Sequence, residues 1–157
     1  MKTILFVCTG NSCRSVMAAE LFRKMLGADA EKIKIISAGV DTITGMRASD
    51  YTLEVLQREG IDAAKHRSMQ VTEELLEKSD LIIVMERFHK YRVLGMAPSV
   101  KNKVHLLREF LKAPDEIVEP EIPDPIGRPL EVYERSLDLI REGLKDLVSW
   151  IRKNGWV

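Results

Sequence analysis

The sequence has only two cysteines, no excess charge of either sign and no long apolar run. The spacing C-x4-C without a third cysteine excludes a four-cysteine zinc site, and the three dispersed histidines His66, His89 and His105 form no metal-ligand cluster. The 24 basic residues balance the 24 acidic ones, so we expect no general attraction to nucleic acid or to an anionic membrane. No apolar stretch is long enough for a bilayer span or for a secretory signal. We therefore expect a cytoplasmic protein that binds anions only at a local site.

Apolar runs alternate with amphipathic stretches along the chain, and its length of 157 residues suits one domain, 1–157. The expected strands are 3–8, 32–37, 80–85 and 103–107. The expected helices are 15–26, 48–60, 72–79 and 130–154. This alternation predicts an α/β fold with a mostly parallel sheet, in which ligands bind beyond the carboxyl ends of the strands.

Residues 113–129 contain five of the six prolines, which is typical of a long irregular loop. The loop contains Asp124, which is followed by Pro125 in the sequence "PDPIG". Its carboxylate is a candidate general acid, because a phosphoryl transfer needs a protonated leaving group. The alternative is an ordinary turn aspartate, and spacing alone does not choose between the 24 carboxylates.

The sequence "VCTGNSCRS", residues 7–15, lies between the first expected strand and the first expected helix. Gly10 and Asn11 tolerate positive φ, so the loop can turn its amide groups inward to cradle a phosphate. The helix N-terminus behind the loop also favours an anion, and the guanidinium of Arg14 can bind two phosphoryl oxygens. The expected phosphate-binding residues are Thr9, Gly10, Asn11, Ser12, Cys13, Arg14 and Ser15.

Cys8 is the candidate nucleophile of this loop. The surrounding donors and positive charge favour its thiolate form, and a phosphoryl group bound in the loop would lie over the sulfur. Ser15 is placed to donate a hydrogen bond to that sulfur as it leaves a phosphocysteine intermediate. A buried, inert pair of cysteines is the alternative interpretation of the same residues.

The chain resembles the low-molecular-weight protein-tyrosine phosphatase family over essentially its full length. The resemblance rests on "VCTGNSCRS", on "SAG" at 37–39, on His66, on "SDLIIVM" at 79–85 and on "DP" at 124–125. It implies a single domain with a four-stranded parallel sheet flanked by helices on both faces, and neither a metal nor a cofactor. The implied partner is a phosphorylated protein, and we expect a monomer or a weak dimer.

The resemblance also assigns roles to residues of this chain. It makes Cys8 the nucleophile, Arg14 the phosphate ligand and Asp124 the general acid that later activates water. It further implies that Ser37 and His66 hold Asn11 and thereby support the loop.

Ser12 and Ile126 are the residues expected to select the substrate. Tyrosine phosphatases of the family usually have a bulky aliphatic residue at the first position and aromatic residues after Asp-Pro. The protein-arginine phosphatases of the family are more similar here, with "CTGN", a small hydroxyl residue (threonine) at the position of Ser12, and Asp-Pro followed by an aromatic residue and glycine. This chain departs from them in having serine at position 12 and Ile126 in place of the aromatic residue. A small polar residue leaves room and a hydrogen bond for a guanidinium, so the sequence favours phosphoarginine, with phosphotyrosine as the alternative.

The cysteines of the chain also bear on two further functions and on one form of regulation. Arsenate reductases of this family share the loop but need additional cysteines downstream, which this chain lacks after Cys13. A non-catalytic phosphate-binding module is disfavoured by the joint presence of Cys8, Arg14 and Asp124. Cys8 and Cys13 would form a protective disulfide under peroxide, or Cys13 is simply a small buried residue, and the sequence leaves both interpretations open.

Overall fold

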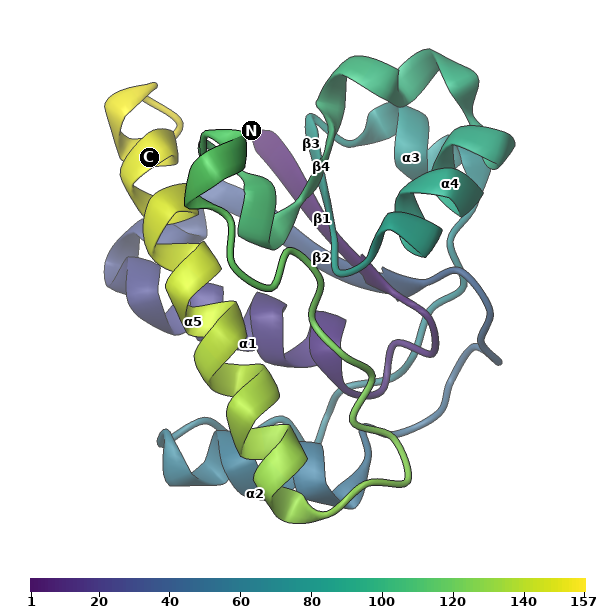
Figure 1. The fold of residues 1–157 in the computed structure, drawn as a ribbon, viewed down its shortest axis with the longest axis vertical. Coiled ribbons are helices and arrows are strands. Elements are labelled where there is room, and N and C mark those ends of the chain that lie inside the picture. The colour runs from purple at the N-terminus through teal and green to yellow at the C-terminus, as the bar shows by residue number, and fades with distance from the viewer.

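The computed structural model describes all residues, 1–157, as a four-stranded parallel sheet between two layers of helices (Figure 1). The sheet order is β2-β1-β3-β4, and the strands are β1 (Lys2–Cys8), β2 (Ile33–Gly39), β3 (Leu81–Val84) and β4 (Val104–Leu106). All three strand pairs are parallel, so the predicted fold class is confirmed. β2 pairs with one edge of β1 and β3 pairs with the other edge, so the direction of strand order reverses at β1. The carboxyl end of β1 is thus the switch point where α/β proteins bind ligands.

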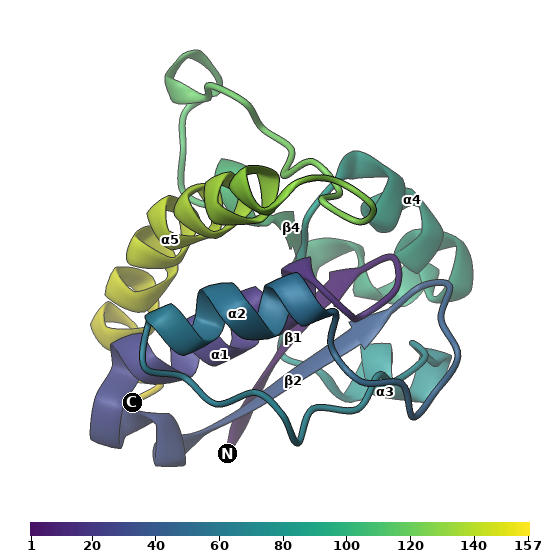
Figure 2. The same cartoon turned by 90° about the horizontal axis from the view of Figure 1, so that it is seen from below.

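The side chains of β1 alternate between two apolar layers, as expected for a strand that is covered on both faces. Ile4, Phe6 and Cys8 belong to the larger core, which packs against α1 (Arg14–Leu26), α2 (Asp50–Arg58) and α5 (Leu130–Lys153). Leu5 and Val7 belong to the smaller core beneath α3 (Glu73–Lys78) and α4 (Arg87–Met96). Figure 2 shows the two helix layers on opposite sides of β1 and β2.

Local sequence signals account for most of the helix boundaries. The side chain of Thr72 accepts a hydrogen bond from the Leu75 amide and caps α3, as its position before two glutamates predicts. The side chain of Ser49 caps α2 in the same way. The long helix α5 buries one apolar face along its length, including Ile140, Leu144 and Leu147. None of the helices has the combination of length and hydropathy that crossing a membrane requires.

Helix α4 was not predicted, because its sequence "RFHKYRVLGM" has little amphipathic character. Only His89 and Val93 of this helix are buried. The helix begins with a reciprocal pair of hydrogen bonds between Glu86 and His89, in place of the usual serine or threonine cap. A polar contact just after β3 therefore sets the start of this helix.

The proline-rich segment 113–129 is irregular, as predicted, apart from a single 3-10 turn at Pro114–Glu116. This turn projects away from the body of the protein in Figure 2. The second half of the segment returns to the sheet, where the buried Ile122 donates its amide hydrogen to the carbonyl of Met85 at 3.0 Å. This contact brings the Asp-Pro sequence next to the carboxyl end of β3.

Gly143 allows α5 to pack closely against the segment that follows β4. A Cβ atom at this position would lie 2.7 Å from Leu107 Cγ and 3.1 Å from the Leu107 carbonyl oxygen. We expect Gly143→Ala to lower the free energy of unfolding by about 1–3 kcal/mol, because the helix must shift to make room.

Urea unfolding measures this change, and Gly95→Ala in α4 is the matched control. A Cβ at Gly95 meets no atom within 4 Å, so this substitution should stabilise the protein by about 0.5–1 kcal/mol. Equal effects of the two substitutions would contradict the close packing at Gly143.

Candidate active site

The segment from Cys8 to Ser15, here called the phosphate loop, curls from the end of β1 into the start of α1. Asn11 has a φ of 53°, which lies in the left-handed region. The sequence predicts this conformation as possible, because glycine and asparagine tolerate positive φ. No side chain caps the N-terminus of α1. The first amide groups of the helix are therefore not used by a capping side chain, which is the arrangement found at anion-binding helix ends.

Asn11 is fully buried and holds the loop in its left-handed turn. Its amide nitrogen donates to the Ser15 hydroxyl at 2.7 Å and to the Ser37 hydroxyl at 2.9 Å, and its side-chain oxygen accepts from the Met69 amide at 2.9 Å. The backbone oxygen of Asn11 accepts a hydrogen bond from His66 Nε2 at 2.8 Å. Three hydrogen bonds from distant segments and one from within the loop thus stabilise a conformation that a non-glycine residue rarely adopts.

Gly39, the last residue of β2, lies directly beneath this turn. A Cβ there would approach the Thr9 carbonyl oxygen to 2.5 Å and the Asn11 nitrogen to 3.0 Å, so only glycine permits the backbones to meet. The sequence signal for this contact is the "SAG" that closes the second strand.

The sulfur of Cys8 is buried and lies 3.0 Å from the Ser15 hydroxyl oxygen. Since the Asn11 amide donates to that same oxygen, the hydroxyl hydrogen of Ser15 remains free to donate to the sulfur. A thiolate at Cys8 would accept this hydrogen bond. The chain from Asn11 through Ser15 to Cys8 therefore links the supports of the loop to the candidate nucleophile.

Arg14 is buried to 1% exposure and is held by acceptors from two other segments. One terminal nitrogen donates to the Ile122 carbonyl at 2.8 Å and lies 3.0 Å from a carboxylate oxygen of Glu86. The other terminal nitrogen lies 3.7 Å from Asp124 Oδ2 and donates to the Thr9 hydroxyl at 3.5 Å. The guanidinium thus has one end fixed in the protein and the other at the pocket, where it can bind an oxyanion.

A pocket of about 150 Å³ opens above the phosphate loop. The structure brings Cys8, Arg14 and Asp124 together in its wall, although Asp124 is 110 residues from Arg14 along the chain. Asp124 stays partly exposed, and its Oδ1 accepts a hydrogen bond from the Ile126 amide at 3.1 Å, as in an Asx turn. The remaining lining residues are Thr9, Gly10, Ser12, Cys13 and Ile126.

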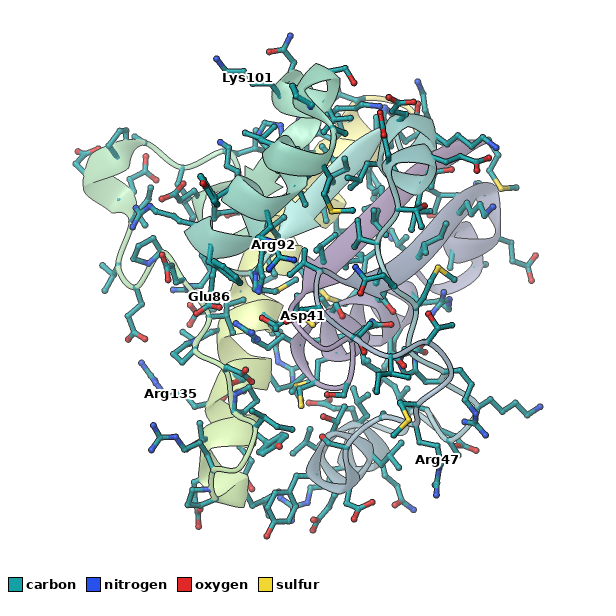
Figure 3. All side chains as sticks on the ribbon, turned by 90° about the vertical axis from the view of Figure 1, so that its right-hand side faces the viewer. Asp41, Arg47, Glu86, Arg92, Lys101 and Arg135 are labelled. Carbon is teal, nitrogen blue, oxygen red and sulfur yellow. The ribbon has the colours of Figure 1, made fainter.

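Sequence analysis missed Glu86 and His89, which both follow β3. The imidazole of His89 is fully buried, and its Nδ1 accepts a hydrogen bond from the Glu86 amide at 3.0 Å. Its Nε2 therefore has the proton and donates to the Thr9 hydroxyl at 2.9 Å. Figure 3 shows Glu86 with Asp41 and Arg92 around the turn between β1 and α1. The sequence signal for these two residues was "ERFH", a mostly polar stretch that follows the expected strand 80–85, where parallel sheets bind ligands.

Cys13 caps the start of α1 with its backbone and is buried like Cys8. Its sulfur lies 3.3 Å from the Ser49 hydroxyl and 3.9 Å from the Tyr133 hydroxyl. Burial raises the pKa of Tyr133 to about 12, so this phenol stays neutral. Both cysteines are free thiols, and the protective disulfide stays a prediction.

His89 makes the stability of this site depend on pH. Burial, with a smaller contribution from the charge of Arg14, lowers the pKa of His89 to about 3, against 6.5 when it is unperturbed. Below pH 6.5 the unfolded chain binds a proton that the folded protein does not, so acid favours unfolding. We expect the wild type to lose about 2 kcal/mol more stability than His89→Gln between pH 7.5 and pH 5.

Urea unfolding of both proteins at the two pH values gives this difference, whatever the substitution costs at neutral pH. Equal losses in the two proteins would contradict a neutral, buried imidazole at this position.

The chain is similar to known proteins in both sequence and fold. The family model "Low molecular weight phosphotyrosine protein phosphatase" matches residues 3–156. The chain is 35% identical to the probable low molecular weight protein-tyrosine-phosphatase EpsP of Ralstonia nicotianae, over 99% of both chains. It is 32% identical to a protein-arginine-phosphatase of Bacillus subtilis, over 96% of this chain and 97% of the relative.

The fold is similar to that of the YwlE arginine phosphatase from Geobacillus stearothermophilus, with a TM-score of 0.86 and 33% identity. That match covers 98% of this chain and 95% of the solved one. Both the sequence and the fold therefore match along nearly the whole chain. The protein belongs to the low molecular weight phosphotyrosine protein phosphatase family.

Proposed function

We propose that this protein hydrolyses phosphorylated side chains of proteins through a phosphocysteine intermediate, and that phosphoarginine is its favoured substrate. The family is one of protein phosphatases, and relatives named for tyrosine and for arginine substrates are both similar to this chain. The observation that carries the proposal is the 150 Å³ pocket whose wall contains a thiol, a guanidinium and a carboxylate.

In the first step the Cys8 thiolate attacks phosphorus, and the bond between phosphorus and the leaving nitrogen or oxygen breaks. Arg14 and the amides of the phosphate loop bind the phosphoryl oxygens, on which negative charge is concentrated in the transition state. Asp124 donates a proton to the leaving nitrogen or oxygen, so that arginine departs as a guanidinium, or tyrosine as a neutral phenol.

In the second step Asp124, now a carboxylate, takes a proton from a water molecule as that water attacks the phosphocysteine. The bond between phosphorus and sulfur breaks, and the Cys8 thiolate leaves with its charge stabilised by the Ser15 hydroxyl. Inorganic phosphate is released, and the enzyme returns to its starting state without a cofactor.

The walls of the pocket support a guanidinium substrate over a phenol. No aromatic side chain is among the lining residues, and Ile126 is the single large apolar one. A phenol ring gains most of its binding energy from contact with aromatic and large apolar side chains. Ser12 offers a hydroxyl group and Asp124 offers a carboxyl group within the same space, and the oxygens of both can accept hydrogen bonds from the N–H groups of a guanidinium.

The test is kcat/KM on a phosphoarginine peptide and on a phosphotyrosine peptide of otherwise identical sequence. We expect the wild type to prefer phosphoarginine, and Ser12→Val to reduce this preference by about tenfold or more, since it removes a hydrogen bond to a charged group. Cys8→Ser serves as the blank. Ser99→Val, at an exposed serine on the opposite side of the sheet from α1, is the matched control and should keep the preference.

A clear preference for phosphotyrosine would overturn the substrate class and leave the tyrosine phosphatase interpretation. Turnover by the wild type no faster than by Cys8→Ser on both peptides would overturn the reaction itself.

A further inference from the structure

A second, larger hollow adjoins the pocket of the phosphate loop. It has a volume of about 510 Å³ and lies along residues 40–49, which connect β2 to α2 and are here called the β2–α2 loop. The two hollows share Gly10, Ser12 and Ile126 in their walls, so they are continuous at the mouth of the site. We call the larger hollow the flanking groove.

The flanking groove exposes apolar side chains that no other part of the protein covers. Ile43 is 75% exposed, Met46 56% and Ile126 54%. Each of these side chains lines the groove. Large apolar residues that gather at the edge of a binding pocket, rather than singly on the surface, are typical of an interaction site.

The β2–α2 loop holds these side chains in a defined arrangement. The buried Ser68 anchors the loop by hydrogen bonds from its side chain and its backbone. Its hydroxyl donates to the Ile43 carbonyl at 2.6 Å and accepts from the Met46 amide at 2.9 Å. Its backbone amide donates to the Met46 carbonyl at 2.7 Å, and its carbonyl accepts from the Gly45 amide at 2.8 Å. The apolar surface is thus preorganised, which reduces the entropy that a ligand must overcome on binding.

The charges at the groove favour neither sign. Asp41 and Arg47 both line it, one residue of each sign of charge. Figure 3 shows Asp41 near the phosphate loop and Arg47 at the outer edge of the molecule, so the two charges lie at different parts of the loop. The apolar residues between them remain the main source of selectivity.

The occupant follows from the sizes of the two hollows. The 150 Å³ pocket has room for a phosphoryl group and the end of the side chain that bears it, so the rest of the substrate must lie across the mouth. A neighbouring side chain of the same polypeptide then reaches the flanking groove, because both hollows open at Ser12 and Ile126.

We infer that the flanking groove binds an apolar side chain next to the phosphorylated residue, and so makes the enzyme select substrates by sequence. This inference rests on the proposed function. It adds Ile43 and Met46 to the residues that determine specificity, and it places them on a loop that takes no part in the chemical steps.

The experiment uses three phosphopeptides. All three contain phosphoarginine or all three contain phosphotyrosine, whichever the wild type hydrolyses faster. Alanine occupies both flanking positions in the first peptide, and leucine replaces the alanine before or after the phosphorylated residue in the other two. We expect one of the leucine peptides to have a kcat/KM about fivefold higher than the alanine peptide, from partial burial of leucine in the groove.

Met46→Ala should reduce this leucine advantage to less than about twofold, because it removes one of the three exposed apolar side chains that line the groove while the backbone anchors at Ser68 remain. Tyr91→Ala is the matched control. It also truncates a large exposed apolar side chain, 77% exposed, but on α4, and should keep the full advantage.

Equal kcat/KM on all three peptides, in a wild type that hydrolyses them, would contradict the binding of a flanking side chain in the groove and leave the proposed function standing. A leucine advantage that survives in Met46→Ala, or that is lost in Tyr91→Ala as well, would also overturn it. No hydrolysis of any peptide, nor of a small aryl phosphate, would overturn the proposed function, and this inference would fall with it.

Discussion

Arg14 is buried at the start of α1, where its guanidinium contacts segments that are far apart in the sequence. It bonds to the carbonyl of Ile122, which belongs to the proline-rich segment, and to the carboxylate of Glu86, which follows β3. A buried guanidinium is costly unless it is paired, so these acceptors are needed for the fold as well as for the site. They also direct the free end of the guanidinium toward the pocket. The contacts that satisfy this buried charge therefore also place a guanidinium at the pocket, where we propose that it binds the phosphoryl oxygens.

The left-handed turn of the phosphate loop also depends on contacts that serve both the fold and the site. Asn11 adopts a φ of 53° because Ser37, His66 and Met69 bind it from other segments, and because Gly39 leaves room beneath it. Once the loop is fixed in this way, the Ser15 hydroxyl is left with one hydrogen for the sulfur of Cys8. The shape of the loop and the surroundings of Cys8, the proposed nucleophile, are thus set by one network of hydrogen bonds.

Sequence patterns predicted the strands, the position of the phosphate loop and most helices, because these depend on local periodicity and on turn residues. Asp124 could be chosen among 24 carboxylates only through a family resemblance, since its place beside Arg14 arises from the docking of Ile122 at β3. Glu86 and helix α4 were missed for a related reason. Their roles come from contacts with Arg14 and Thr9, and a weakly amphipathic sequence does not reveal such contacts.

The proposed mechanism places the covalent chemistry on Cys8, one of two buried cysteines in the same loop. Rapid mixing with a phosphopeptide, followed by quenching and mass-spectrometric peptide mapping, locates the phosphoryl group on the enzyme. We expect a phosphoryl adduct on Cys8 in the wild type and also in Cys13→Ser, whose substituted side chain lies toward Ser49 and Tyr133. An adduct on Cys13, or turnover without any phosphorylated enzyme, would contradict it.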